Sequence, residues 1–259
     1  MDAELNMISV IMCSINPAKF AAVSKNLADR MADAPFEIIG IHDARSLAEG
    51  YNRGIAQSSG DILIFCHDDI EIITPDFDVR IRQYLEANDV VGCAGTSCLI
   101  DSNWIYAGDP FVHGVVAYPA DDAWPANRFD LVVWGGLNSA TITGVQALDG
   151  FFMATNRRVV ETIRFDESSF DGFHVYDTDF TFAAHLAGYK VAVCKDILIA
   201  HQSRGNFGEA YAAYAAKFMQ KYRGRLPAQS HKSRKAAVAR NLDRAQLEHL
   251  FNTRIGPHS

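Results

Sequence analysis

The sequence lacks the glycine-rich motifs by which many nucleotide-binding proteins are recognised. No Gly-x-Gly-x-x-Gly follows the first apolar segment, residues 7–13, and no Walker-type loop is present. A dinucleotide-binding protein with the usual fingerprint and a P-loop protein are therefore excluded. Any nucleotide would have to be held mainly by a metal ion and by side chains at the ends of strands.

Long apolar runs, a basic leader and surplus positive charge are also missing. No segment is apolar for long enough to span a bilayer, and the first residues, Met1 to Glu4, are acidic rather than basic. The net charge of −7 gives no support to nucleic-acid binding. The five cysteines are an odd number without paired spacing, so neither a disulfide framework nor a zinc site is expected. We therefore expect a cytoplasmic protein with no transmembrane segment and no nucleic-acid partner.

Basic residues are enriched at the end of the chain, where residues 223–259 hold eight of the 24 Lys and Arg residues, and we treat this segment as a C-terminal extension. Within it, Val238, Leu242 and Leu250 recur at helical spacing, which predicts a helix over residues 231–254. Such a helix could be docked on the body and solvated, or it could contact anionic lipid at the inner face of the membrane. The apolar stripe is thin, which favours the solvated helix.

The rest of the chain alternates between strand and helix patterns. Apolar, β-branched runs over residues 7–13, 36–41 and 62–66 predict buried strands, and helical spacing over 18–31 and 47–55 predicts the helices between them. This order is typical of a doubly wound, parallel α/β sheet. Right-handed crossovers would bring the carboxyl ends of these strands to one edge of the sheet.

Further strands are predicted over residues 90–95, 145–155 and 190–200, but the pattern loosens over residues 97–144. That irregular stretch contains scattered aromatic residues, Trp104, Tyr106, Trp124, Phe129 and Trp134. Aromatic rings in a polar loop can stack on a sugar or a base. They can also simply pin the loop to the body, and for any single ring this second interpretation is favoured.

The strand over residues 62–66 ends in three polar residues, His67, Asp68 and Asp69. Open α/β sheets bind ligands at this edge. The two carboxylates would repel each other without a cation or solvent between them, and hard oxygen ligands suit Mg²⁺ or Mn²⁺. A solvated turn, in which Asp is common, is the alternative that these residues alone leave open.

Four further polar residues interrupt or end apolar segments. Asp149, next to Gly150, lies inside an apolar run, where a carboxylate is costly unless it is partnered or functional. Asp177 and Asp179 fall in the first turn of a predicted helix, where simple capping could explain them because carboxylates gain about 0.3–1 kcal/mol there. His201 ends a strand, a place where a lone histidine is usually just exposed.

Taken in order, these segments resemble the family 2 glycosyltransferases with the GT-A fold over roughly residues 7–203. Residues 9–16 are similar to the family's opening strand, and residues 47–55 to its Ala-Arg-Asn-x-Gly helix. Residues 64–69 are similar to the strand that carries the Asp-x-Asp metal motif. Residues 148–153 resemble the acceptor-side strand, and residues 176–180 resemble the Glu-Asp-x-Asp-Leu segment that carries the catalytic base.

The resemblance implies an α/β fold of the GT-A type, a three-layer α/β/α sandwich with a mostly parallel, mixed central sheet, over residues 1–222. It implies an inverting transfer of a sugar from a nucleotide-diphospho-sugar donor to an acceptor hydroxyl, with Mg²⁺ or Mn²⁺ as cofactor. The acceptor would be a glycan, a lipid-linked molecule or a small molecule, in polysaccharide, glycoconjugate or antibiotic biosynthesis.

The resemblance also implies roles for individual residues. The metal would be held by Asp69 and His201, and Asp177 would be the base, with Asp179 supporting it or capping the helix. Asp149 and Gly150 would contact the acceptor. The donor would be held by Ser14, Asn16, Asp43, Asn52, His67 and Asp68.

The sequence departs from the family pattern at three places. His67 stands where the first Asp of Asp-x-Asp is expected, and Tyr176 stands where the Glu before the base is expected. Residues 42–45 replace the usual Asp-Asp-Gly-Ser. These departures indicate a divergent branch, and the alternative is a catalytically degenerate module that binds a nucleotide sugar or a glycan. A nucleotidyltransferase is disfavoured because no glycine-rich, basic loop follows the first strand.

Overall fold

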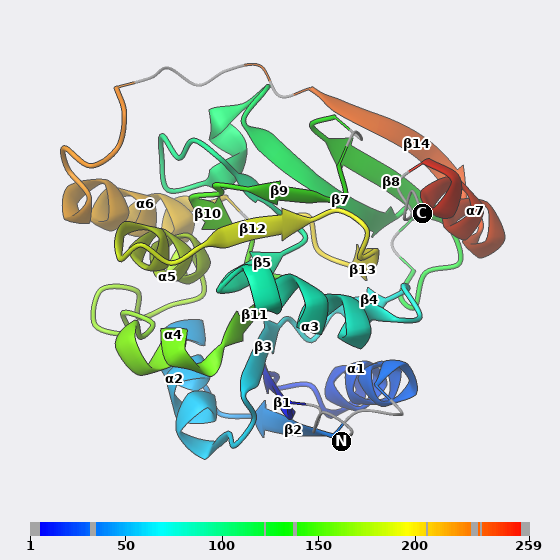
Figure 1. Ribbon diagram of the computed structural model, residues 1–259, viewed down its shortest axis with the longest axis horizontal. Helices are drawn as coiled ribbons and strands as arrows, with labels where there is room; N and C mark the ends of the chain where they lie inside the picture. Colours follow the sequence, from blue (N-terminus) through cyan, green and yellow to red (C-terminus); the bar gives the residue numbers. More distant parts are fainter. Residues whose placement is uncertain are drawn as a thin grey trace.

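The computed structural model describes residues 6–31, 35–121, 123–136, 139–205, 207–228, 233 and 235–254. Its centre is a seven-stranded mixed sheet (Figure 1). In spatial order its strands are β2 (Phe36–Ile41), β1 (Ile8–Cys13), β3 (Ile62–Cys66), β11 (Phe152–Asn156), β5 (Val90–Gly92), β12 (Val191–Cys194) and β9 (Thr141–Thr143). β2, β1 and β3 are parallel, whereas β11 runs antiparallel to both of its neighbours.

Helices cover both faces of this sheet. One face carries α1 (Pro17–Arg30) and α3 (Phe77–Ala87); the other carries α2 (Leu47–Gln57), α4 (Arg157–Thr162), α5 (Tyr176–Leu186) and α6 (Glu209–Lys221) (Figure 1). Side chains of a strand alternate between faces, so Ile64 of β3 packs in the cluster beneath α1 and α3 while Phe65 packs in the cluster beneath α2 and α5. The expected three-layer α/β/α sandwich of the GT-A type is therefore confirmed.

A second sheet lies beside the first. It contains β10 (Ala147–Leu148), β6 (Ala94–Thr96), β7 (Val112–Pro119), β13 (Ile199–His201), β4 (Ile70–Ile72) and β8 (Phe129–Trp134), and a short helix, η1 (Trp104–Ala107), precedes β7. The single strands predicted over residues 90–95, 145–155 and 190–200 are each divided between the two sheets. That prediction is wrong because apolar content shows that a segment is buried but not which strand it pairs with.

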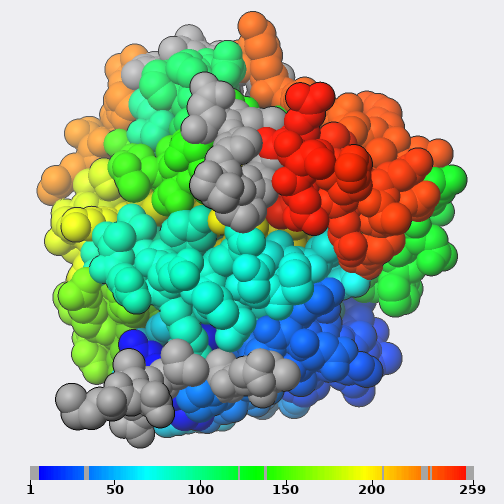
Figure 2. Space-filling model, turned by 45° about the vertical axis from the view of Figure 1, so that its right-hand side comes forward, coloured from blue at the N-terminus to red at the C-terminus, as the bar shows by residue number. Residues whose placement is uncertain are grey.

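The C-terminal segment also differs from its prediction. Residues Ala236–Leu242 form a strand, β14, that pairs antiparallel with β8, and only residues Arg244–Arg254 form a helix, α7. The helix prediction is wrong for β14 because β8 offers a free edge, and pairing with it outweighs the helical spacing. Figure 2 shows this segment, coloured orange to red, on the outside of the molecule.

The C-terminal segment is nevertheless anchored to the body. Leu247 and Phe251 of α7 are buried in a cluster with the second sheet, and Arg244 forms an ion pair with Glu71. Arg240 lies 3.5 Å from Asp130, so part of the basic charge is neutralised within the protein. The alternative of a contact with anionic lipid gains no support from this arrangement. In the described part of the chain, no helix is both long and apolar enough to cross a membrane.

Candidate active site

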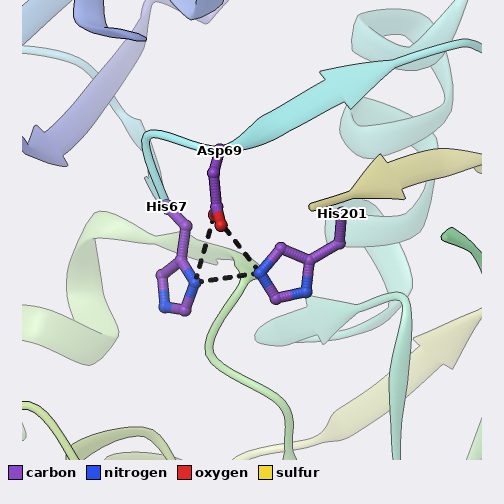
Figure 3. Close-up of side chains that lie close together, drawn as sticks. All are labelled: His67, Asp69 and His201. Atoms are coloured by element: carbon purple, nitrogen blue, oxygen red, sulfur yellow. Dashed lines mark hydrogen bonds and ion pairs between the residues drawn. The ribbon is translucent and has the colours of Figure 1, made fainter. Parts of the chain in front are cut away.

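Three titratable side chains converge where β3 and β13 end. His67 and Asp69 lie in the turn between β3 and β4, and His201 is the last residue of β13, which pairs with β4 so that His201 lies opposite Ile70. His201 Nε2 is 3.3 Å from Asp69 Oδ1 and 3.3 Å from His67 Nδ1, as the dashed lines in Figure 3 show. Strand pairing therefore brings together residues that are more than 130 positions apart.

This group has the donor set and the charge that a divalent cation requires. One ligand atom from each of the three side chains lies within 4.8 Å of the others. Burial opposes ionisation of Asp69, but its hydrogen bond to His201 and the charge of that ring hold the pKa of the carboxyl well below its usual range. Burial, together with the charge of His201, lowers the pKa of His67 to about 4, so that its ring is neutral at pH 7. A carboxylate and a neutral imidazole are the forms that bind metals.

Two of the three departures from the family pattern contact each other. The Tyr176 hydroxyl lies 2.8 Å from His67 Nε2, whereas Asp69 and His201 lie near Nδ1, the other nitrogen of the ring. Tyr176 begins α5, directly after Val175, whose backbone is left-handed with φ of 67°. A Cβ on Gly150 would lie 2.4 Å from the Tyr176 hydroxyl, so only glycine at position 150 leaves the tyrosine this place.

A cavity of about 330 Å³ opens on one side of the group. Its walls include Ser14, at the end of β1, and Asp68, at the end of β3. The Ser14 hydroxyl donates to Asp68 Oδ2 at 2.6 Å, which ties the two strand ends together. The predicted convergence of these strand ends is thus present.

The other predicted donor residues make contacts elsewhere. Asn16 Oδ1 accepts from the backbone N–H groups of residues 18 and 19 and caps α1. Asp43 is exposed and lies 2.8 Å from Arg53, and Asn52 exchanges two hydrogen bonds with the backbone of Phe165. None of these three side chains is in the wall of the cavity beside Ser14.

A larger cavity, of about 440 Å³, opens on the other side. Trp104 and Trp134 line it, with ring centroids 5.4 Å apart, whereas Phe129 from the same irregular stretch is buried in the core. Asp149 also lines this cavity, where its Oδ2 accepts a hydrogen bond of 2.8 Å from Trp104 Nε1. This hydrogen bond offsets the cost of placing the Asp149 carboxylate inside an apolar run.

Asp177 lies in the wall of the same cavity. The backbone N–H of Gly150 donates to its Oδ2 at 2.7 Å. Burial raises the pKa of Asp177 to about 7, and the negative charge of Asp149 adds to this rise. A carboxyl that titrates near neutral pH is suited to proton transfer. His67, Phe173 and Ser203 line both cavities, so the two spaces meet at the three-residue group.

Comparison with known proteins decides the family. Residues 9–222 match the model of the Glycosyltransferase like family. The chain belongs to this family. No curated protein matches the sequence.

Two solved structures are similar to the chain at low sequence identity. GalNAc-T7, solved with UDP, GalNAc and Mn²⁺, superposes with a TM-score of 0.50 at 10% identity, over 85% of this chain and 48% of that one. PcManGT, a mannosyltransferase from Pyrobaculum calidifontis solved with GDP-Man and Mn²⁺, gives 0.49 at 10% identity, over 85% and 62%. This glycosyltransferase-family chain therefore spans less than two thirds of either neighbour, and the likeness to GalNAc-T7 shows a shared GT-A fold.

Asp179, the second predicted catalytic residue of this glycosyltransferase-family protein, points into the body instead. Its side chain is 2% exposed and lies 2.7 Å from Lys221 Nζ of α6, and the Tyr222 hydroxyl donates to the same carboxylate oxygen at 2.8 Å. It lines neither of the two cavities. Its contacts tie α5, which carries Asp177, to α6.

Replacing Lys221 with methionine is expected to lower the free energy of unfolding by roughly 3 kcal/mol. The change leaves the buried Asp179 charge with only the Tyr222 hydroxyl, and the value is at the low end for buried pairs because Lys221 is a third exposed. Urea unfolding would measure it. Lys217→Met is the matched control on α6, since Lys217 pairs with the exposed Asp171 and such pairs contribute less than about 1 kcal/mol. Equal losses in both variants would contradict the prediction.

Two residues of the site were not predicted from the sequence. The Ser203 hydroxyl lies 3.0 Å from His201 Nε2, and Arg204 lies over the Tyr118 ring at 4.8 Å in the wall of the larger cavity. Their only signal is their position directly after His201, and polar residues after a strand are ordinary turn formers.

Proposed function

We propose that this protein is an inverting glycosyltransferase that moves a sugar from a nucleotide-diphospho-sugar to an acceptor hydroxyl, in polysaccharide, glycoconjugate or antibiotic biosynthesis. The observation that carries the proposal is the meeting of two cavities at His67 and Ser203, with Asp69 and His201 beside the junction. The smaller cavity would hold the donor and the larger one the acceptor. The presence of UDP, GalNAc and Mn²⁺ in the structure of GalNAc-T7 supports this assignment.

On the donor side, Ser14 and Asp68 would contact the nucleoside, because they line the smaller cavity at the ends of β1 and β3. Asp69 and His201 would hold Mg²⁺ or Mn²⁺. The cation, when bound, supplies positive charge against the diphosphate that leaves. Donor contacts by Asn16, Asp43 and Asn52 stay predictions, since these side chains are engaged elsewhere.

On the acceptor side, Asp177 would take the proton of the acceptor hydroxyl. The acceptor oxygen then bonds to the anomeric carbon, while the bond from that carbon to the diphosphate oxygen breaks on the opposite face, which inverts the configuration. Gly150 N–H holds one oxygen of Asp177 at 2.7 Å, and Trp104 holds Asp149 at 2.8 Å, so both carboxylates face the cavity in fixed orientations. Asp179 would act at a distance, by anchoring α5.

A thermal-shift series with nucleoside diphosphates, with and without Mn²⁺, tests the donor site. We expect one nucleoside diphosphate with Mn²⁺ to stabilise the protein by about 2.7 kcal/mol at one hundred times its Kd. The nucleotide found would then be supplied as sugar conjugates to a panel of glycans, lipid-linked and small-molecule acceptors. Stabilisation without transfer or hydrolysis would favour the non-catalytic binding module, and no stabilisation by any nucleotide would overturn the proposal.

A further inference from the structure

We propose that His67 is a third metal ligand and that Tyr176 is the residue that positions it, so that the site prefers Mn²⁺ to Mg²⁺. This inference rests on the proposed function, in which Asp69 and His201 hold the cation. It gives His67 and Tyr176, which both differ from the family pattern, a joint role in binding the metal.

The first step of the argument is the direction of the His67 ring. Nδ1 faces Asp69 and His201, at 3.9 Å from Asp69 Oδ1 and 3.3 Å from His201 Nε2, and Nε2 faces the Tyr176 hydroxyl at 2.8 Å. A neutral imidazole carries its proton on one nitrogen only. When Nε2–H donates to the Tyr176 oxygen, the lone pair of Nδ1 points at the other two ligands. The Tyr176 hydroxyl can itself donate to the carbonyl of Gly150, 3.4 Å away.

The second step is that burial and packing hold the Tyr176 side chain in place. The side chain is 4% exposed, and its ring packs against Tyr51 and Phe165, with centroids 5.7 and 6.3 Å away. Gly150 leaves the space that the hydroxyl fills. A rigidly held hydrogen-bond partner of a metal-binding histidine fixes the orientation and the tautomer of the imidazole ring. Loss of such a partner lowers the metal affinity by about 10–100-fold.

The third step concerns the ion. Two imidazole nitrogens and one carboxylate oxygen are an unfavourable set for Mg²⁺, which binds oxygen almost exclusively. Imidazole binds first-row transition ions well, and Mn²⁺ accepts both nitrogen and oxygen. His67→Asp would exchange nitrogen for oxygen, and we expect it to lower the ratio of Mn²⁺ to Mg²⁺ affinity.

The experiment is a titration of the full chain with Mn²⁺, followed by electron paramagnetic resonance, without donor or acceptor. We expect Tyr176→Phe to weaken Mn²⁺ binding by about 10–100-fold. Tyr84→Phe is the matched control: this tyrosine lies on α3 near Asp196, away from the three ligands, and should leave the affinity unchanged. Electron spin-echo modulation should detect two bound imidazole nitrogens in the wild type and one in His67→Asp.

The outcomes separate this inference from the proposed function. In the His67→Asp background, Tyr176→Phe should have no further effect on the affinity, because its partner is gone. If Mn²⁺ binding is lost in Asp69→Ala but unchanged in both His67→Asp and Tyr176→Phe, this inference is overturned and the proposed function stands. If the wild type binds no Mn²⁺, even with a nucleoside diphosphate, both are overturned. If Tyr176→Phe does not fold, the number of imidazole nitrogens bound to Mn²⁺ in the wild type and in His67→Asp decides whether His67 is a ligand.

Discussion

Asp177→Asn is expected to lower kcat for glycosyl transfer by about 10²–10⁴-fold, the contribution of a positioned general base. Asparagine keeps the shape of the side chain and an oxygen that can accept the hydrogen bond from Gly150 N–H. It has no carboxylate to take the acceptor proton. Steady-state kinetics would measure kcat, and calorimetry would measure the Kd of the nucleoside diphosphate with Mn²⁺, which should not change.

The pH dependence provides the control for this assignment. Because burial and Asp149 raise the pKa of Asp177 to about 7, kcat/KM should rise as the pH rises through 7 and the base loses its proton. The raised pKa of Asp177 stabilises the folded state most at acidic pH. This stabilisation is lost as the pH rises from the pKa of the aspartate in the unfolded chain towards 7. Asp177→Asn should therefore be more stable than the wild type at neutral pH. The assignment of Asp177 as the base would be contradicted if the variant lost donor binding, or if kcat/KM of the wild type did not rise through pH 7.

Asp69→Ala is expected to remove Mn²⁺ binding and to lower kcat/KM by about 10²–10³-fold, which corresponds to the several kcal/mol that a metal ion supplies. The variant deletes the one carboxylate of the group and leaves His201 without its partner 3.3 Å away. The difference in thermal stabilisation by a nucleoside diphosphate with and without Mn²⁺ would measure the effect.

Asp29→Ala is the matched control for that variant, because Asp29 is exposed on α1 and pairs only with Lys25 among the ion pairs found in the described residues. Its Mn²⁺ dependence should equal that of the wild type. Undiminished Mn²⁺-dependent stabilisation in Asp69→Ala would place the cation elsewhere.

The strands and helices near the N-terminus could be predicted because their signals are local. Ile8–Cys13 and Ile62–Cys66 are apolar and β-branched, as buried strands must be, and Ser46 caps α2 through its hydrogen bond to the N–H of Glu49. The polar residues that end β3 could be predicted to meet other strand ends, because parallel strands share one edge. Asp177 could be predicted from its place in a motif and lines a cavity.

The aromatic residues and the C-terminal segment show where local signals stop. Nothing in the residues around Trp104 separates a ring that lines a cavity from one that fills the core, as Phe129 does. Val238 and Leu242 have helical spacing, yet they lie in β14 because the edge of β8 is there to pair with. Both outcomes depend on which distant segments of the chain pack or pair with these residues.

The sequence by itself determined the layered α/β architecture and the residues at the ends of its strands, because periodicity and turn residues act within one segment. Only the tertiary structure decided that Asp179 faces Lys221 rather than a cavity. It also decided that His67 and Tyr176, which look in the sequence like two separate departures from the family pattern, share a hydrogen bond. The physical reason is the same in each case. Pairing of strands and packing of helices bring side chains from distant positions within a few ångströms, and no local pattern records that distance.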